Sequence, residues 1–426
     1  DLVGNGHFSL PYSVVGSFSG ALFEHPAAFR VTSDNDWIRF DIEGMASHAD
    51  VYQLIDYEDI GVIDGVLSFD GALDIAMTDT NVTNLALTSD LVGLEVRLPS
   101  YLGKEASVSS PLALDVQFLD AYQSIRWSYE DTQGWLHHGD KIERGAIGVG
   151  TTPPTSAQDQ QAVAISGTLD TLTLSEWVSE EGEARVALPL DWKIDGLQVK
   201  KLVIDDLAFT DLILGGEQAG ETVGFTFVSE DLTGRVDIPA AGLMEIELAH
   251  LRLPSSGENV SKYLGGDQLS VERLGFSLGI PVLDPIDVAV GYRLPHAKVD
   301  LNLLYLDQDP FGSWHFVMQP KEDVVWINNL NADVNGVHIS DGQLDWNLTE
   351  NVSHFKGTVV LDDLSQTLPL WDYAPVLETT KASMQADAAW SGSPANVNLA
   401  GLNGDLGFTA RELLLARRGA FCSPTI

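Results

Sequence analysis

The chain has 426 residues, 44% of them hydrophobic, and 62 Asp and Glu against 23 Lys and Arg give it a formal charge of −39. This excess of acid argues against binding to nucleic acid and against electrostatic docking on anionic lipid headgroups. The hydrophobic fraction argues against intrinsic disorder, and a single cysteine, Cys422, excludes an internal disulfide.

No run of about 18 apolar residues occurs, so the sequence predicts no membrane-spanning helix. The chain has no signal peptide and does not begin with Met. We therefore expect it to be an interior piece of a larger protein.

Short stretches of alternating residues follow one another through the first part of the chain. Trp37, Arg39 and Asp41 share one side of a short strand, and residues 61–99 and 112–129 predict further strands in series. Turns rich in glycine separate these stretches, and no long amphipathic helix pattern interrupts them.

The same pattern continues through the second half of the chain. Strands are predicted over residues 188–214, 223–254, 282–292, 298–306 and 311–348. Short helices are predicted only near residues 172–178 and 364–370. A strand of about 6–9 residues, a turn and another strand thus form one motif repeated many times, which predicts an all-β fold.

The clearest alternation lies in residues 355–408. Each strand there has one apolar and one polar side, and Asn403-Gly404 is a strong hairpin signal. The shared phase predicts a single apolar surface. Its predicted members are Val359, Leu361, Met384, Trp390, Val397, Leu399, Leu406 and Phe408.

The sequence offers no constellation that carries chemistry, so we expect no catalytic residue, no metal site and no cofactor. The adjacent pair His137-His138 lacks the spacing of metal ligands. A calcium loop that would begin at Asp307 fails, because Phe311 and Met318 occupy positions that need oxygen ligands. Hydrolase, metalloprotease and nucleotide-binding motifs do not occur either.

Several motifs resemble those of the YhdP family of AsmA-like envelope proteins in Gram-negative bacteria. Residues 390–394 (WSGSP) and 399–404 (LAGLNG) resemble a signature near the C-terminal end of that family. Residues 89–99, 144–150 and 234–239 resemble earlier segments in the same order. The resemblance covers roughly residues 60–409, and the tail departs from it, since the family pattern continues with another strand after Phe408.

The resemblance implies an elongated, twisted antiparallel sheet curled into an open groove, with the apolar surface defined above as its lipid-lining floor and few short helices. It implies a bridge that carries phospholipid between inner and outer membranes, in the periplasm, tethered to the inner membrane by an N-terminal segment not present here. We expect a monomeric, non-enzymatic protein with residues 1–409 as the groove region and 410–426 as an irregular tail.

The residues themselves leave an alternative open. A closed β-sandwich with a dry core would satisfy the same composition and alternation, as in a structural or adhesive β-repeat protein. The two hypotheses differ in whether the alternating faces form one continuous trough or several sealed cores.

Overall fold

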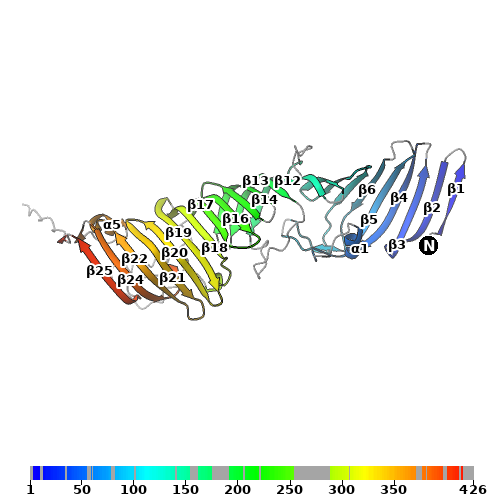
Figure 1. Ribbon diagram of the computed structural model, residues 1–426. Helices are drawn as coiled ribbons and strands as arrows, with labels where there is room; N and C mark the ends of the chain where they lie inside the picture. The colour runs from blue at the N-terminus through cyan, green and yellow to red at the C-terminus, as the bar shows by residue number, and fades with distance from the viewer. Residues whose placement is uncertain are drawn as a thin grey trace, which may run out of the picture. The chain divides into compact units, whose positions relative to one another are not determined.

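A computed structural model shows the fold as two compact units built from β-strands (Figure 1). Unit 1 contains residues 1–179, 184–202 and 213–218, and unit 2 contains residues 180–183, 203–212 and 219–426. The structure describes residues 3–9, 13–33, 36–54, 59, 61–77, 82–99, 102–139, 142–153, 162–174, 191–204, 207–219, 222–253, 288–306, 308–370, 377–379, 381–396, 401–411 and 414–415.

Unit 1 is a sheet whose neighbouring strands are mostly consecutive in the chain. Its elements are β1 (Val3–Ser9), β2 (Ser13–Leu22), β3 (His25–Ser33), β4 (Trp37–Ser47), α1 (His48–Leu54), β5 (Ile63–Ala76), β6 (Thr83–Ser89), β7 (Leu94–Val96), β8 (Leu112–Phe118), β9 (Gln123–Tyr129), β10 (Thr132–His138), β11 (Ile142–Val149) and β12 (Val163–Thr173). The pairs are antiparallel except β11 with β12, and β6 pairs with β8 while β7 pairs with β5. Strands β13 (Trp192–Ile204) and β14 (Leu207–Ala219) contribute residues to both units.

Unit 2 repeats this plan. Its elements are β15 (Thr222–Val228), β16 (Leu232–Pro239), β17 (Met244–Leu253), α4 (Val288–Gly291), β18 (Ala297–Leu306), β19 (Asp309–Lys321), β20 (Val324–Val334), β21 (Val337–Asn347), β22 (Val352–Leu361), α5 (Leu364–Leu370), β23 (Leu377–Glu378), β24 (Lys381–Ser391), the 3-10 turn η3 (Pro394–Asn396), β25 (Asn403–Arg411) and β26 (Leu414–Leu415). The pair β17–β18 is parallel, and β23 pairs with β26 apart from the main sheet.

The predicted all-β fold with few short helices is confirmed. In the described part of the chain, the edge strands β1 and β25 each have one neighbour, so the sheet is open. The parallel pairs β11–β12 and β17–β18 were not anticipated, because parallel pairing needs a long crossover that alternation does not reveal.

Tight turns explain why consecutive strands pair. Asn335 and Gly336 both have positive φ angles, of 47° and 77°, between the paired residues Val334 and Val337. This is the type I′ geometry whose twist matches that of antiparallel strands. The corresponding prediction at Asn403-Gly404 is wrong, since both residues lie inside β25.

Gly404 lies within a paired strand and not in a turn. A Cβ at this position would lie 2.2 Å from the carbonyl oxygen of Asp387 on β24. The glycine therefore permits a close approach of two backbones, a requirement that the dipeptide alone does not distinguish from a hairpin.

The helix predicted at residues 364–370 is confirmed as α5. Near residues 172–178, Leu172 and Thr173 belong to β12, and residues 175–178 lie outside the described residues. The strand predicted over 282–292 is wrong where the structure describes it, because Val288–Gly291 form α4. Val288 packs on a core cluster instead of extending the sheet.

Candidate functional site

The register of unit 2 creates an unbroken apolar row across ten strands. Residues directly opposite each other in a ladder point to the same side of a sheet. The row runs through Phe227, Gly234, Leu248, Leu301, Trp314, Ala332, Ile339, Val359, Met384 and Phe408, one from each of β15 to β22, β24 and β25. We call the side of the sheet that carries this row the apolar face of unit 2.

Six of the eight residues predicted to share a surface lie on this face. Val359 faces Met384, which faces Phe408, and the neighbouring register pairs place Leu361, Trp390 and Leu406 on the same side. The other two, Val397 and Leu399, lie outside the described residues. The assignment of this surface to lipid stays a prediction.

The six residues differ in exposure. Val359 and Trp390 are 8% and 6% exposed, and the indole Nε1 of Trp390 donates to the carbonyl of Ser393 at 2.9 Å. Leu406 and Phe408 are 50% and 53% exposed, because β25 pairs with β24 alone in the described part of the chain.

Unit 1 carries an equivalent row that the sequence analysis did not single out. It runs through Gly4, Phe18, Phe29, Ile42, Gly71, Leu87, Leu114, Trp127, Gly134, Ile147 and Ile165, one from each of β1 to β6 and β8 to β12. We call this side the apolar face of unit 1. Alternation over residues 1–60 is weak, and only the pairing shows that the strands of unit 1 are in phase.

Glycines on the apolar face of unit 1 receive large side chains from neighbouring strands. A Cβ on Gly134 would lie 2.1 Å from the Trp127 indole, and one on Gly44 would lie 3.0 Å from the Phe69 ring. The aromatic rings therefore lie across the backbone of the next strand, and they keep the face apolar where no side chain is present.

The ends of both apolar faces are covered. In unit 1, Val51 of α1 packs on a cluster of Leu67, Leu91 and Leu94, while Lys104 Nζ donates to the carbonyl of Leu91 at 2.8 Å. In unit 2, α4 packs on a cluster that is centred on Ala297, Met318, Val325, Trp346 and Leu348.

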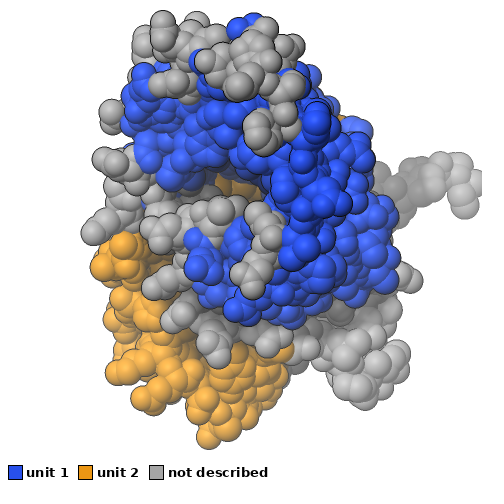
Figure 2. All heavy atoms as spheres, turned by 90° about the vertical axis from the view of Figure 1, so that its right-hand side faces the viewer, with its two compact units in different colours: residues 1–179, 184–202, 213–218 blue, residues 180–183, 203–212, 219–426 orange. Residues whose placement is uncertain are grey.

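Between these covers, large residues of the apolar faces are only partly buried. Phe18, Leu87 and Trp127 in unit 1 and Trp314 and Phe355 in unit 2 are all of intermediate exposure. No second sheet covers them among the residues that the structure describes. Figure 2 shows that the atoms of unit 1 curve around a hollow.

The opposite side of unit 2 is polar and held together by charge pairs. His354 on β22 bridges Asp345 on β21 at 3.2 Å and Asp387 on β24 at 2.7 Å, and Lys356 also reaches Asp387 at 3.0 Å. The hydrogen bond with Asp387 raises the pKa of His354, and the same bond lowers the pKa of Asp387. His315 and Lys298 bind Asp300 in the same manner.

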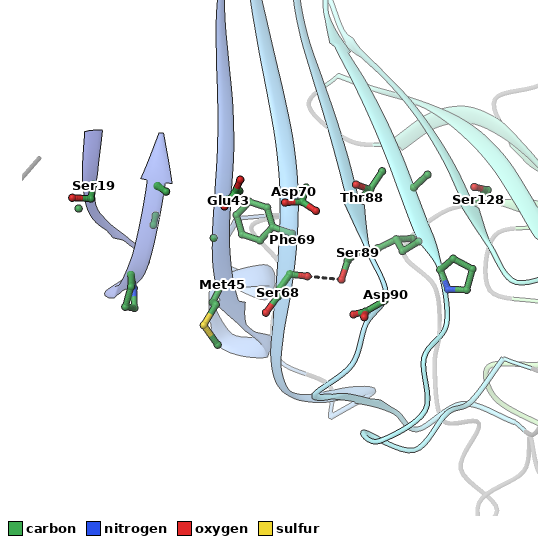
Figure 3. Close-up of a pocket in the computed structure, with 18 of the residues that line it drawn as sticks. Ser19, Glu43, Met45, Ser68, Phe69, Asp70, Thr88, Ser89, Asp90 and Ser128 are labelled. Atoms are coloured by element: carbon green, nitrogen blue, oxygen red, sulfur yellow. Dashed lines mark hydrogen bonds between the residues drawn. The ribbon is translucent and has the colours of Figure 1, made fainter. Parts of the chain in front are cut away.

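An open cavity of about 950 Å³ lies on the sheet of unit 1 (Figure 3). It follows one register row of small and acidic residues, which includes Ser19, Glu43, Asp70, Thr88 and Ser128. Within it, Ser89 Oγ donates to the carbonyl of Ser68 at 2.7 Å. Its lining also includes Gly44 and Phe69, whose positions in the ladder are on the apolar face.

Among the described residues, no group of three His, Cys, Asp or Glu side chains is placed to hold a metal ion. In the same part of the chain, no helix has the length and apolar character needed to cross a membrane. The expectations of no catalytic residue and no cofactor stay predictions.

The fold and the site together define a class of all-β proteins that display a continuous apolar face on an open sheet. The family model of the YhdP protein matches residues 13–422, nearly the whole chain. The chain therefore belongs to the YhdP family of AsmA-like cell-envelope proteins. Searches of curated proteins and of solved structures found no match to this chain.

Proposed function

We propose that this chain is a non-enzymatic lipid carrier that holds phospholipid acyl chains against its apolar faces. The observation that carries the proposal is the unbroken apolar row in each unit, whose large side chains are only partly buried. Membership of the YhdP family supports the same reading. Transfer between inner and outer membranes through the periplasm, by a monomer tethered by a segment outside this chain, belongs to this proposal.

The dimensions of the row suit acyl chains. Ten strands at ~4.8 Å spacing give a row of about 43 Å along the sheet. One leaflet of a bilayer occupies about 15 Å, half of the ~30 Å hydrocarbon core. The row in either unit is therefore long enough for more than one lipid to lie along it.

The energetics require no specific polar contact. Burial of an acyl chain gains ~0.8 kcal/mol per CH₂ group, so Leu, Val and Phe side chains alone can retain it. A row without polar interruptions also has no site that would bind the lipid much more tightly than its neighbours. A carrier needs this property if lipid is to move along it. The acidic polar sides keep the sheet soluble and discourage pairing between copies.

The alternative is a structural or adhesive protein whose apolar faces are closed and dry. Mass spectrometry of the purified chain distinguishes the two. The carrier proposal predicts co-purified phospholipid, and the dry-core alternative predicts none.

Two matched charge variants test whether the lipid lies on the apolar face or on the polar side of unit 2. Met384 and Gln385 are neighbours on β24, on the apolar and polar sides respectively. Met384→Asp places a charge where an acyl chain would lie, which costs several kcal/mol when the ion is buried, so co-purified lipid should fall sharply. Gln385→Asp should leave it unchanged. Equal lipid content in two folded variants would contradict the proposal.

A further inference from the structure

Two arginines and a histidine converge on the polar side of unit 1. His137 on β10 lies directly opposite Arg144 on β11, and Trp135, two residues before His137, lies opposite Arg126 on β9. Directly opposite and diagonal neighbours in a ladder are within reach of such long side chains. All four side chains therefore lie on one side of three neighbouring strands.

The contacts fix the hydrogen-bonding state of the imidazole. Arg144 Nε donates to His137 Nδ1 at 3.1 Å, which leaves Nε2 as the N–H donor of the neutral ring. The ring stacks on Tyr122 with centroids 4.5 Å apart, and Trp135 lies at 5.1 Å on a tilted plane. The aromatic neighbours hold the imidazole in place.

The charged neighbours of His137 are mostly cations. Burial lowers the pKa of His137, the Arg144 and Arg126 guanidiniums lower it further, and Glu143 acts in the opposite direction. The imidazole is therefore uncharged near neutral pH, and it stands between two fixed positive charges.

Two other arginines of the same unit have carboxylate partners. Arg39 pairs with Asp41 and Asp74, and Arg97 pairs with Glu95 and Asp64. Within the described ranges, by contrast, no carboxylate lies at ion-pair distance from Arg126 or Arg144, although Asp115 faces Arg126 across the ladder. Two exposed guanidiniums thus keep donors available in a chain with a net charge of −39.

We propose that Arg126, His137 and Arg144 form a binding site for the phosphate group of a phosphodiester. Guanidinium groups match phosphate oxygens in geometry and charge. Donors arriving from three strands suit a tetrahedral anion better than a planar carboxylate, which one guanidinium can satisfy alone. The Trp135 and Tyr122 rings supply an apolar wall for the carbon groups beside the phosphate. This site is separate from the apolar faces and does not depend on the proposed carrier function.

The source of the phosphodiester is a lipid headgroup or a soluble molecule, and calorimetry with the whole chain distinguishes them. The probes are glycerophosphoglycerol, phosphatidylglycerol vesicles and phosphatidylcholine vesicles. Saturable binding of glycerophosphoglycerol supports the site for a soluble or headgroup diester. Binding of vesicles alone, if lost in the arginine variants, assigns it to lipid at a surface.

Substitutions of Arg126 and Arg144 test whether these residues bind the phosphodiester. Arg126→Gln and Arg144→Gln should each weaken binding about tenfold, the effect of losing a charge-assisted hydrogen bond. Arg126→Lys should retain part of the affinity if the glutamine variants fold poorly. Arg39→Gln, whose carboxylate partners already neutralise it, is the control and should change affinity by less than about twofold.

The pH profile gives a second readout. A bound anion raises the pKa of His137, so binding takes up a proton and affinity should rise from about pH 8 to about pH 6. The single charge of the diester stays constant over this range, and His137→Gln should remove the dependence. Absence of saturable binding to every probe, or equal weakening by Arg39→Gln, would overturn the proposal.

Discussion

Units 1 and 2 each have an apolar face, but their polar sides are built differently. In unit 2, His354, Asp345 and Asp387 join three neighbouring strands through charge pairs. In unit 1, the polar side holds the cluster around His137. The property that both units keep is the unbroken apolar row, which points to that row as the common working surface.

The units also cover the ends of their apolar faces with different elements. Unit 1 uses α1 and the loop before β7, whereas unit 2 uses α4 against Trp346 and Leu348. Different segments thus cover the end of the apolar face in each unit. In the described residues, no second layer covers the centre of either face.

The largest expected effect tests the cover of unit 2. Trp346 is 1% exposed, and its Nε1 donates to Asn351 at 3.0 Å. Trp346→Ala should lower the free energy of unfolding by about 3–5 kcal/mol, since it opens a cavity in the cluster. Chemical denaturation measures this loss.

Trp326 on β20 is the matched control, because it is 44% exposed. Trp326→Ala should cost less than about 1 kcal/mol. Equal losses from the two substitutions would show that the assignment of buried and exposed sides in unit 2 is wrong.

A smaller effect is expected from the glycine positions of unit 1. Gly134→Ala places a Cβ 2.1 Å from the Trp127 indole, so the ring must move off the strand. We expect a loss of about 1–3 kcal/mol in unfolding free energy, as for other overpacked sites. Gly407→Ala in unit 2 is the control, since its Cβ would meet nothing closer than 3.9 Å. If thermal denaturation shows no difference between them, aromatic packing on glycine does not maintain the face.

The smallest effect concerns the polar side of unit 2. Because the pKa of His354 is raised, chiefly by its hydrogen bond with Asp387, its contribution to stability is complete below its unfolded pKa, near 6.5. That contribution is lost as the pH rises through the raised folded pKa. The Asp387 contribution follows the opposite sign and disappears only in acid, because its pKa is lowered.

His354→Gln should therefore destabilise the protein more at about pH 5.5 than at about pH 8.5. The difference should be less than about 1 kcal/mol, since the His354 side chain is 38% exposed. His250→Gln is the control, because its Nε2 contacts the backbone carbonyl of Glu230 and, among the described residues, no carboxylate. A pH dependence that is equal in both variants would assign the effect to the general charge of the chain.

The sequence was sufficient for the fold class and for the face that carries Val359, Met384 and Phe408, because period-two alternation is a local property. It was insufficient for the equivalent face of unit 1, since Ile42 and Leu87 belong to one row only through pairing. It also misplaced Val288–Gly291, where Val288 packs on a cluster, and Asn403-Gly404, where glycine permits close backbone approach. Tertiary contacts decide these positions, and no local pattern reports them.

Photo-crosslinking to phospholipid tests the central claim most directly. Probes at Leu85 and Met384 lie on the apolar faces of units 1 and 2, and probes at the adjacent Ala86 and Gln385 lie on the polar sides. The carrier account predicts crosslinks to phospholipid from Leu85 and Met384 in both units, with little from Ala86 and Gln385. Equal crosslinking from the two sides, or none from the apolar faces of a folded protein, would contradict it.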